Sequence, residues 1–376
     1  MKKILAMIAL AILFNINAQN HRASGGDTHF GSGSFNTATG HEALYNHTSG
    51  IKNTALGHQA LLNNSTGHYN TASGFLALYT NISGNYNTAS GYLALFNNST
   101  GKYNTASGAY ALYANTGSEN TAYGYNALRY NTYGTGNSAS GYEALTKNST
   151  GYYNTAFGYQ ALTENINGHY NTSSGYQALF SNTSGGYNTA TGSYALYSNK
   201  SGNYNTASGF KALKENTTGY HNTASGYAAL HNNTTASSNT ATGYQALYKN
   251  TSGNSNTATG DRALYNNTTG LRNIASGYYA LYNNETGGNN TASGFFALQK
   301  NTSGSYNNAS GSYALYQNTG NHNNALGYEA LYNNTSGQKN TASGNYALRT
   351  NTTGYHNTAF GYQTNASKID AVNQTI

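Results

Sequence analysis

The sequence contains no cysteine and no proline, and only 7% of its 376 residues are charged. The absence of cysteine excludes disulfide bonds, thiolate metal ligands and thiol nucleophiles. Polar chains with so little charge include disordered, low-complexity proteins. Disordered proteins do not need a strict register, however, and this chain keeps one over most of its length, which argues against disorder.

The ionisable residues are scattered, which argues against several kinds of site. Hydrolysis needs paired carboxylates or a nucleophile beside a base, but the glutamates fall in separate repeats. Calcium-binding β-rolls need a repeated aspartate, and the only aspartates are Asp27, Asp261 and Asp370. The eleven histidines fall at different phases, and the basic residues form no cluster suited to nucleic acid. We therefore expect no enzyme, no catalytic residue, no cofactor, no metal and no nucleic-acid partner.

A 17-residue repeat dominates what is present. Its motif, Asn-Thr-Ala-x-Gly-x-x-Ala-Leu, occurs nineteen times from Asn36 to Asn340, and a degenerate twentieth copy begins at Asn357. Two copies follow after 16 residues instead of 17, those at Asn120 and Asn323. With the asparagine as position 1, the consensus is Asn-Thr-Ala-Ser-Gly-Tyr-x-Ala-Leu-Tyr-x-Asn-Thr-Ser-Gly-x-Tyr. A fixed short period indicates one structural unit stacked on itself.

The chain divides into four regions. Residues 1–18 combine two lysines, a short apolar run and a terminal alanine, which is typical of a secretory signal peptide. Residues 19–35 are expected to form a cap or linker, 36–361 the array, and 362–376 a degenerate end that looks cut short. The apolar run is too short to span a bilayer comfortably, and no later segment is more apolar. We therefore predict export, to the cell surface or the extracellular space, with no membrane span.

The unit favours an all-β, parallel β-solenoid of about twenty coils. Short strands with glycine corners fit 17 residues better than helices, because glycine disfavours a helix. We predict one strand over positions 17 to 4 (86–90), a corner at Gly91, a second strand over positions 6 to 11 (92–97) and a returning turn. The two 16-residue copies lose a residue in that turn, where deletions are tolerated. Stacked at about 4.8 Å per coil, twenty coils would extend roughly 95 Å.

Identical residues would then align along the stack. We expect Ala89, Ala94 and Leu95 to fill the interior. Asn98 at position 12, and the asparagine at position 1, should form ladders of side-chain amides. The predicted structural residues of the repeat are Gly91, Ala89, Ala94, Leu95 and Asn98.

Aromatic residues recur at positions 6, 10 and 17. Where position 6 is small, as at Ala109, tyrosine occupies position 7, as at Tyr110. These rings either cover the outer face of a monomer or pack between chains of an oligomer. The second alternative is favoured because a narrow coil gains apolar burial by association. The candidate surface-contact residues are Tyr86, Tyr92, Tyr153, Tyr159, Tyr170, Tyr176 and Tyr204.

The motif resembles the head repeats of trimeric autotransporter adhesins of the YadA-like group, whose motif runs roughly Asn-x-x-Ala-x-Gly-x-x-Ala-x-Ala. Asn87, Ala89, Gly91 and Ala94 occupy the corresponding places here. The resemblance covers residues 36–361. It implies a left-handed β-roll, a homotrimer and attachment to surfaces or matrix proteins. The family's unit is usually nearer 14 residues, and its coiled-coil stalk and membrane β-barrel are not visible here. Phage-type tail fibres and other exported repeat proteins carry similar arrays.

Three functions are compatible with these observations. The first is an adhesin or fibre head that presents tyrosine, asparagine and threonine to glycans, matrix proteins or a neighbouring cell surface. The second is a passive spacer. The third is ice binding by the threonine at position 2, which recurs in sixteen of the twenty copies. We favour the first.

Overall fold

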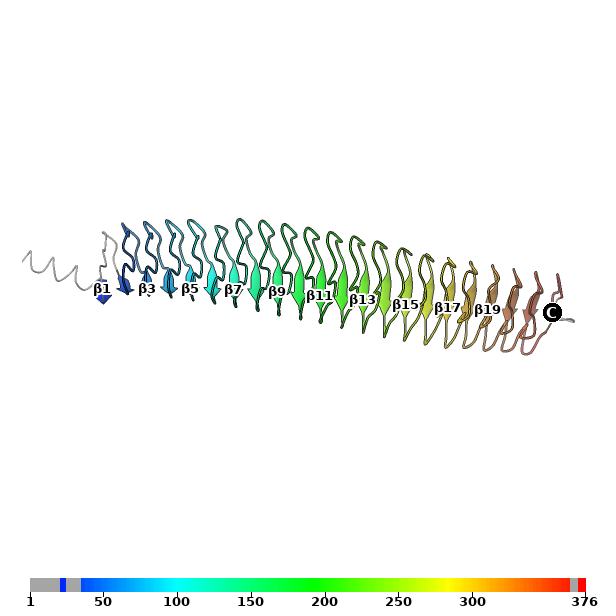
Figure 1. Cartoon of the computed structure of the whole chain (residues 1–376). Coiled ribbons are helices and arrows are strands. Elements are labelled where there is room, and N and C mark those ends of the chain that lie inside the picture. Colours follow the sequence, from blue (N-terminus) through cyan, green and yellow to red (C-terminus); the bar gives the residue numbers. More distant parts are fainter. Residues whose placement is uncertain (1–20, 25–34, 366–370) are drawn as a thin grey trace, which may run out of the picture. The chain divides into compact units, whose positions relative to one another are not determined.

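The computed structural model describes residues 21–24, 35–365 and 371–376. The predicted signal peptide lies outside these residues, as does most of the predicted cap or linker. The described residues form a parallel β-solenoid in which each coil contributes one short strand, and they contain no helix (Figure 1). The prediction of an all-β, parallel solenoid of about twenty coils is confirmed.

The chain forms two compact units, Met1–Gln177 with Ser181–Ser184, and Ala178–Phe180 with Gly185–Ile376. The strands of the first unit are β1 (His21–Ser24), β2 (Asn36–Thr39), β3 (Thr54–Leu56), β4 (Thr71–Ser73), β5 (Thr88–Ser90), β6 (Thr105–Ser107), β7 (Thr121–Tyr123), β8 (Ser138–Ser140), β9 (Thr155–Phe157) and β10 (Thr172–Ser174). Those of the second are β11 (Thr189–Thr191), β12 (Thr206–Ser208), β13 (Thr223–Ser225), β14 (Thr240–Thr242), β15 (Thr257–Thr259), β16 (Ile274–Ser276), β17 (Thr291–Ser293), β18 (Asn308–Ser310), β19 (Asn324–Leu326), β20 (Thr341–Ser343) and β21 (Thr358–Phe360).

Within each unit, the repeat strands pair in parallel with the same positions of the neighbouring coil. In β5 and β6, for example, Thr88 lies opposite Thr105 and Ala89 opposite Ala106. The alanine at position 3 points inward, and positions 2 and 4 point outward. The predicted start of the strand at position 17 is wrong. Tyr86 has a φ of 57°, a left-handed conformation that belongs to a turn rather than a strand.

The predicted second strand over residues 92–97 is also wrong, because this segment is a series of turns. Leu93 and Leu95 have φ angles of 55° and 51°, which cost an L-residue about 1–2 kcal/mol each. Regular hydrogen bonding between coils accompanies this strain. The Leu93 amide donates to the Phe75 carbonyl in the preceding coil, and the Leu95 amide to the Ala111 carbonyl in the following coil, both at 2.9 Å. The coils therefore stack in register around their turns as well as along their strands.

Glycine at position 5 makes the predicted corner. Gly91 has a φ of 135°, and the equivalent glycines of all twenty copies fall between 118° and 141°. L-residues rarely adopt this region. A Cβ on Gly91 would also lie 2.7 Å from the carbonyl oxygen of Gly108 in the next coil. Both the turn and the close approach of coils require glycine here.

The interior consists of apolar side chains and two amide ladders, as predicted. Ala89, Ala94 and Leu95 are fully buried, and so are the asparagines of positions 1 and 12. The Asn98 side-chain amide donates to Asn81 Oδ1 at 3.1 Å and to the Gly101 carbonyl at 3.0 Å.

Both ladders meet at the glycine carbonyl of position 15. The Asn87 side-chain amide donates to the same Gly101 carbonyl at 2.8 Å, and the Asn87 backbone amide donates to Asn70 Oδ1 at 3.0 Å. Buried amides cost free energy unless they are paired. The two ladders therefore satisfy the polar groups that line a thin core.

The short copies confirm that the deletion falls in the returning turn. Strands β6 and β7 stay in register, with Thr105 opposite Thr121. The Asn115 side-chain amide still donates to the Gly117 carbonyl at 2.8 Å, although only Thr116 lies between the two residues. A strand could not absorb such a deletion without a register shift.

Both ends of the array carry additional pairing. Strand β1 lies within the stretch expected to be a cap or linker, and it pairs in parallel with β2. At the other end, Thr375 bridges Thr358. The Gln374 amide donates to Asn357 Oδ1 at 3.1 Å. Gln374 therefore occupies position 1 of a further coil.

Candidate functional site: aromatic columns on the outer surface

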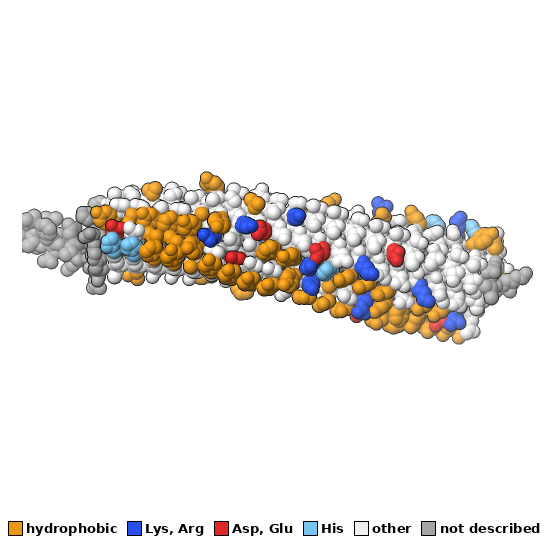
Figure 2. Space-filling view, viewed as in Figure 1, with side chains coloured by type: hydrophobic (Ala, Val, Ile, Leu, Met, Phe, Trp, Pro, Cys, Tyr) orange, Lys and Arg blue, Asp and Glu red, His pale blue; other side chains and the backbone are white. Residues whose placement is uncertain are grey.

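A column of rings at position 6 runs through the first unit. Neighbouring centroids are 5.1–6.2 Å apart, within the usual range for aromatic pairs. Its large rings are 42–47% exposed, except for Tyr110, which is half-buried. Figure 2 shows hydrophobic side chains gathered in a band over the N-terminal coils. The members of this position-6 column are His41, His58, Phe75, Tyr92, Tyr110, Tyr125, Tyr142, Tyr159 and Tyr176.

Tyr110 explains the exchange of rings between positions 6 and 7. It projects from position 7 of a coil whose position 6 is alanine, and it makes edge contacts with Tyr92 at 5.4 Å and Tyr125 at 6.2 Å. It also contacts Tyr113 of position 10 at 5.9 Å. The ring at position 7 thus restores the column and joins it to the rings of position 10.

One coil of the second unit replaces the ring with a guanidinium. Position 6 is Asp261, but the neighbouring Arg262 lies 5.2 Å from the Tyr244 ring and 5.5 Å from the Tyr279 ring. These are cation–π distances. The residue types alone show no ring at positions 6 and 7 of this coil, and the arginine takes the place of the ring because its guanidinium is also flat.

The rings of position 17 form shorter stacks on the other side of the strand. In the first unit, Tyr86 stacks on Tyr69 at 4.7 Å and on Tyr103 at 5.2 Å, and Glu119 and Gly136 then follow at this position. In the second unit, Tyr204 stacks on the rings of Tyr187 and His221, each at 4.9 Å. These position-17 stacks are interrupted, unlike the position-6 column of the first unit.

The seven predicted contact residues are therefore divided between two surfaces, and all seven are exposed. Position 6 supplies Tyr92, Tyr159 and Tyr176. Position 17 supplies Tyr86, Tyr153, Tyr170 and Tyr204. The printed ring contacts of Tyr86 are with other position-17 rings, whereas those of Tyr92 are with rings of the position-6 column.

Two phenols of the position-6 column, those of Tyr110 and Tyr142, have raised pKa values and are protonated at neutral pH. The Glu143 carboxylate and desolvation raise the pKa of Tyr142. Desolvation and the neighbouring Tyr92 raise the pKa of Tyr110. These two rings therefore present neutral, hydrogen-bonding hydroxyls and apolar faces, which suit non-covalent contact.

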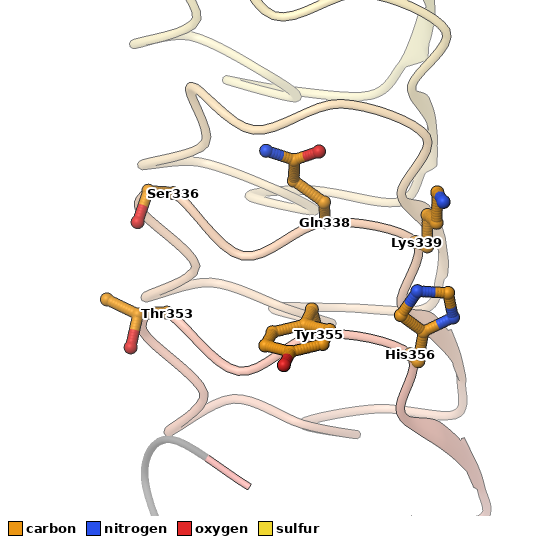
Figure 3. Close-up of a pocket in the computed structure, with 6 residues that line it drawn as sticks. All are labelled: Ser336, Gln338, Lys339, Thr353, Tyr355 and His356. Carbon is orange, nitrogen blue, oxygen red and sulfur yellow. The ribbon is translucent and has the colours of Figure 1, made fainter. Parts of the chain in front are cut away.

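A shallow hollow near the C-terminal end is lined by Lys339, Tyr355 and His356, whose side chains come from adjacent coils (Figure 3). Its lining contains no carboxylate that could pair with the histidine as an acid–base couple. Across the described ranges, no three metal-ligating side chains lie together, and no helix is long and apolar enough to cross a membrane.

Comparison with known protein families finds no matching family. Comparison with curated proteins finds no matching protein.

Proposed function

We propose that this chain is a non-enzymatic, exported attachment protein whose aromatic rings bind extracellular polymers. The observation that carries the proposal is that the interior is complete without the outer rings. Alanine, leucine and asparagine fill the coil, while the rings remain half-exposed in register. Exposed aromatic surface of this extent usually marks an interaction site. A passive spacer would not need it.

We also propose that the chain assembles as a homotrimer, with the left-handed coil of the YadA-like heads. The position-6 column is an unbroken run of rings in the first unit, and association would bury its exposed faces. The position-17 stacks, such as Tyr69, Tyr86 and Tyr103, would then remain available to a glycan, a matrix protein or a neighbouring cell surface.

Binding of the purified chain to an array of glycans and matrix proteins tests the attachment function. We expect at least one class to bind, and replacement of Tyr86 and Tyr103 by serine to weaken binding at least fivefold, because each stacked ring contributes about 1 kcal/mol. A chain that binds no class on the array, or a variant that binds as well as the natural chain, would contradict the proposal.

Molar mass by light scattering tests the assembly. A trimer is expected, and serine at both Tyr142 and Tyr159 should weaken it. A monomeric natural chain would exclude the trimer and weaken the analogy with the adhesins.

Ice binding is a second candidate, favoured by one feature of the second unit. From β11 to β15, five consecutive strands carry threonine at position 2 and a hydroxyl residue at position 4. These residues pair in register, as Thr206 does with Thr223. Such rows of hydroxyls and methyls, about 4.8 Å apart, could order water until Ile274 interrupts them. Thermal hysteresis is the test, with Thr223→Tyr as the disrupting variant. A natural chain without hysteresis removes this candidate.

A further inference from the structure

A slot on the outer face of the first unit is bounded by two aromatic rings. Tyr123 of β7 and Phe157 of β9 form its walls, and Ser138, Ala139 and Ser140 of β8 form its floor. Position 4, which supplies both walls, is serine or threonine in most coils and carries an aromatic ring only at Tyr123, Phe157 and Phe360. This is the one place in the sequence where two such rings flank a small residue.

The space between the two walls is wide enough for one further aromatic ring. They lie two coils apart, which is about 10 Å. A ring placed midway would be about 5 Å from each wall, and the position-6 rings of the same coils have that spacing. Tyr142 lies 5.3 Å from Tyr125 and 5.1 Å from Tyr159. Tyr123 and Phe157 are 49% and 61% exposed, and neither stacks on another ring among the described residues.

A second departure from the repeat deepens the slot at its floor. Ser138 is the only serine at position 2 among the twenty copies, so the methyl group of the usual threonine is absent between the walls. Thr121 and Thr155 keep that methyl on either side. The coil between the rings is therefore small at both of its outward positions.

The chemistry of the lining selects the occupant. The lining has no charged group and no side-chain amide, and it offers only hydroxyls beside two ring faces. A sugar would need several directed hydrogen bonds, whereas a neutral aromatic ring needs only the two faces. We propose that the slot binds one neutral aromatic ring, the phenylalanine or tyrosine side chain of a partner polypeptide. The biological meaning of this site rests on the proposed attachment function.

Saturation-transfer NMR of the full chain tests the site, with the amides of N-acetylphenylalanine and N-acetyltyrosine as probes. Rings elsewhere on the surface also stack weakly, so the comparison between variants is the readout. Ser140→Phe should fill the slot and abolish the slot-dependent signal. Phenylalanine already occurs at position 4 in β9, so the variant should fold. Tyr123→Ser and Phe157→Ser restore the consensus residue and should each weaken binding about fivefold.

Ser208→Phe in β12 is the matched control. It adds the same ring at position 4 between Thr191 and Ser225, where there is no slot, and should leave the probe signal unchanged. Equal signals from Ser140→Phe and the natural chain would overturn the proposal. Binding of methyl β-glucoside in place of the aromatic amides, blocked by Ser140→Phe, would overturn the choice of occupant.

The NMR test of the slot and the array test of the attachment function can fail independently. Loss of array binding with the slot signal intact would contradict only the attachment function. Array binding with no slot-dependent signal would contradict only the slot.

Discussion

The asparagine ladders inside the coil and the aromatic columns outside it share one period but tolerate change differently. Position 1 is asparagine in all twenty copies, and position 12 departs from it only at His47 among the first nineteen. At position 6, by contrast, tyrosine is exchanged for phenylalanine, for histidine, for a ring from position 7 or for the guanidinium of Arg262. A ladder needs a side chain that donates a hydrogen bond to the equivalent residue of one neighbouring coil and accepts one from that of the other. A column needs only a side chain with a flat face that can stack.

The largest effect is expected where coils touch through their backbones. Gly91→Ala would place a Cβ 2.7 Å from the Gly108 carbonyl at a φ of 135°. Backbone strain and overpacking together should cost about 3–5 kcal/mol in the free energy of unfolding, measured by chemical denaturation. Gly288→Ala is the control, because that glycine has no positive φ and its nearest contact is 3.1 Å. Similar losses for both variants would contradict the proposed role of the corner.

A break in one amide ladder should cost somewhat less. Asn98 also accepts from the Asn115 amide at 3.0 Å, so Asn98→Ala leaves several buried groups without a partner. We expect a loss of about 2–4 kcal/mol and faster hydrogen exchange in the neighbouring coils. Asn97→Ala, at the outward position where another coil carries Ala114, should change stability by less than about 0.5 kcal/mol. A ladder variant as stable as this control would show that the ladder is dispensable.

His47, the one residue that replaces asparagine in the position-12 ladder, should make the first coils sensitive to acid. The His47 ring is buried, its Nδ1 lies 3.0 Å from the Asn64 carbonyl and its Nε2 3.1 Å from the Asn36 amide. Burial lowers the pKa of His47 below 6.5. The folded state therefore binds fewer protons than the unfolded state, and the stability present above pH 6.5 is lost as the pH falls through the folded pKa.

Hydrogen exchange of residues 36–52 between pH 7.5 and 5 measures this effect, which should be smaller than the loss from Asn98→Ala. His47→Asn restores the regular rung and should remove the acid sensitivity of these coils. Persistence of that sensitivity in the variant would assign it to other groups.

The smallest loss of stability is expected from changes to the outer rings, such as those of the position-17 stacks. Tyr86→Ala removes a ring stacked on two others and should cost about 1 kcal/mol. Tyr86→His should be nearly neutral, because His221 already stacks on Tyr204 at 4.9 Å. Chemical denaturation of the two variants compares them. A loss as large as that of Asn98→Ala would erase the distinction between ladder and column.

The sequence pattern predicted the interior better than the path of the backbone. Period and chemistry together identified the ladders at Asn98 and its equivalents, the corner at Gly91 and the site of the short copies. The same reasoning wrongly predicted a strand over residues 92–97. Leucine rarely adopts the left-handed conformation that Leu93 and Leu95 have. The positive φ angles of these leucines are accompanied by hydrogen bonds to adjacent coils. The conformational propensity of a single residue does not include such contacts.

The outer surface was predicted only in part for a similar reason. Composition located the rings, but it could not divide Tyr86 and Tyr92 between separate stacks. It also did not pair Tyr123 with Phe157 across the serine of an intervening coil. These relations depend on which positions face outward, and an error in the predicted strands changes that assignment.

The central claim is that the interior holds the fold while the outer rings are free to bind. Hydrogen exchange of a chain with serine at Tyr69, Tyr86 and Tyr103 tests it most directly. We predict that the backbone amides of Thr88 and Leu95, which donate to the next coil, keep most of their protection and lose no more than about 1 kcal/mol for each ring removed. A larger loss, comparable with that of Asn98→Ala for each ring, would show that the rings are part of the core and would contradict the account.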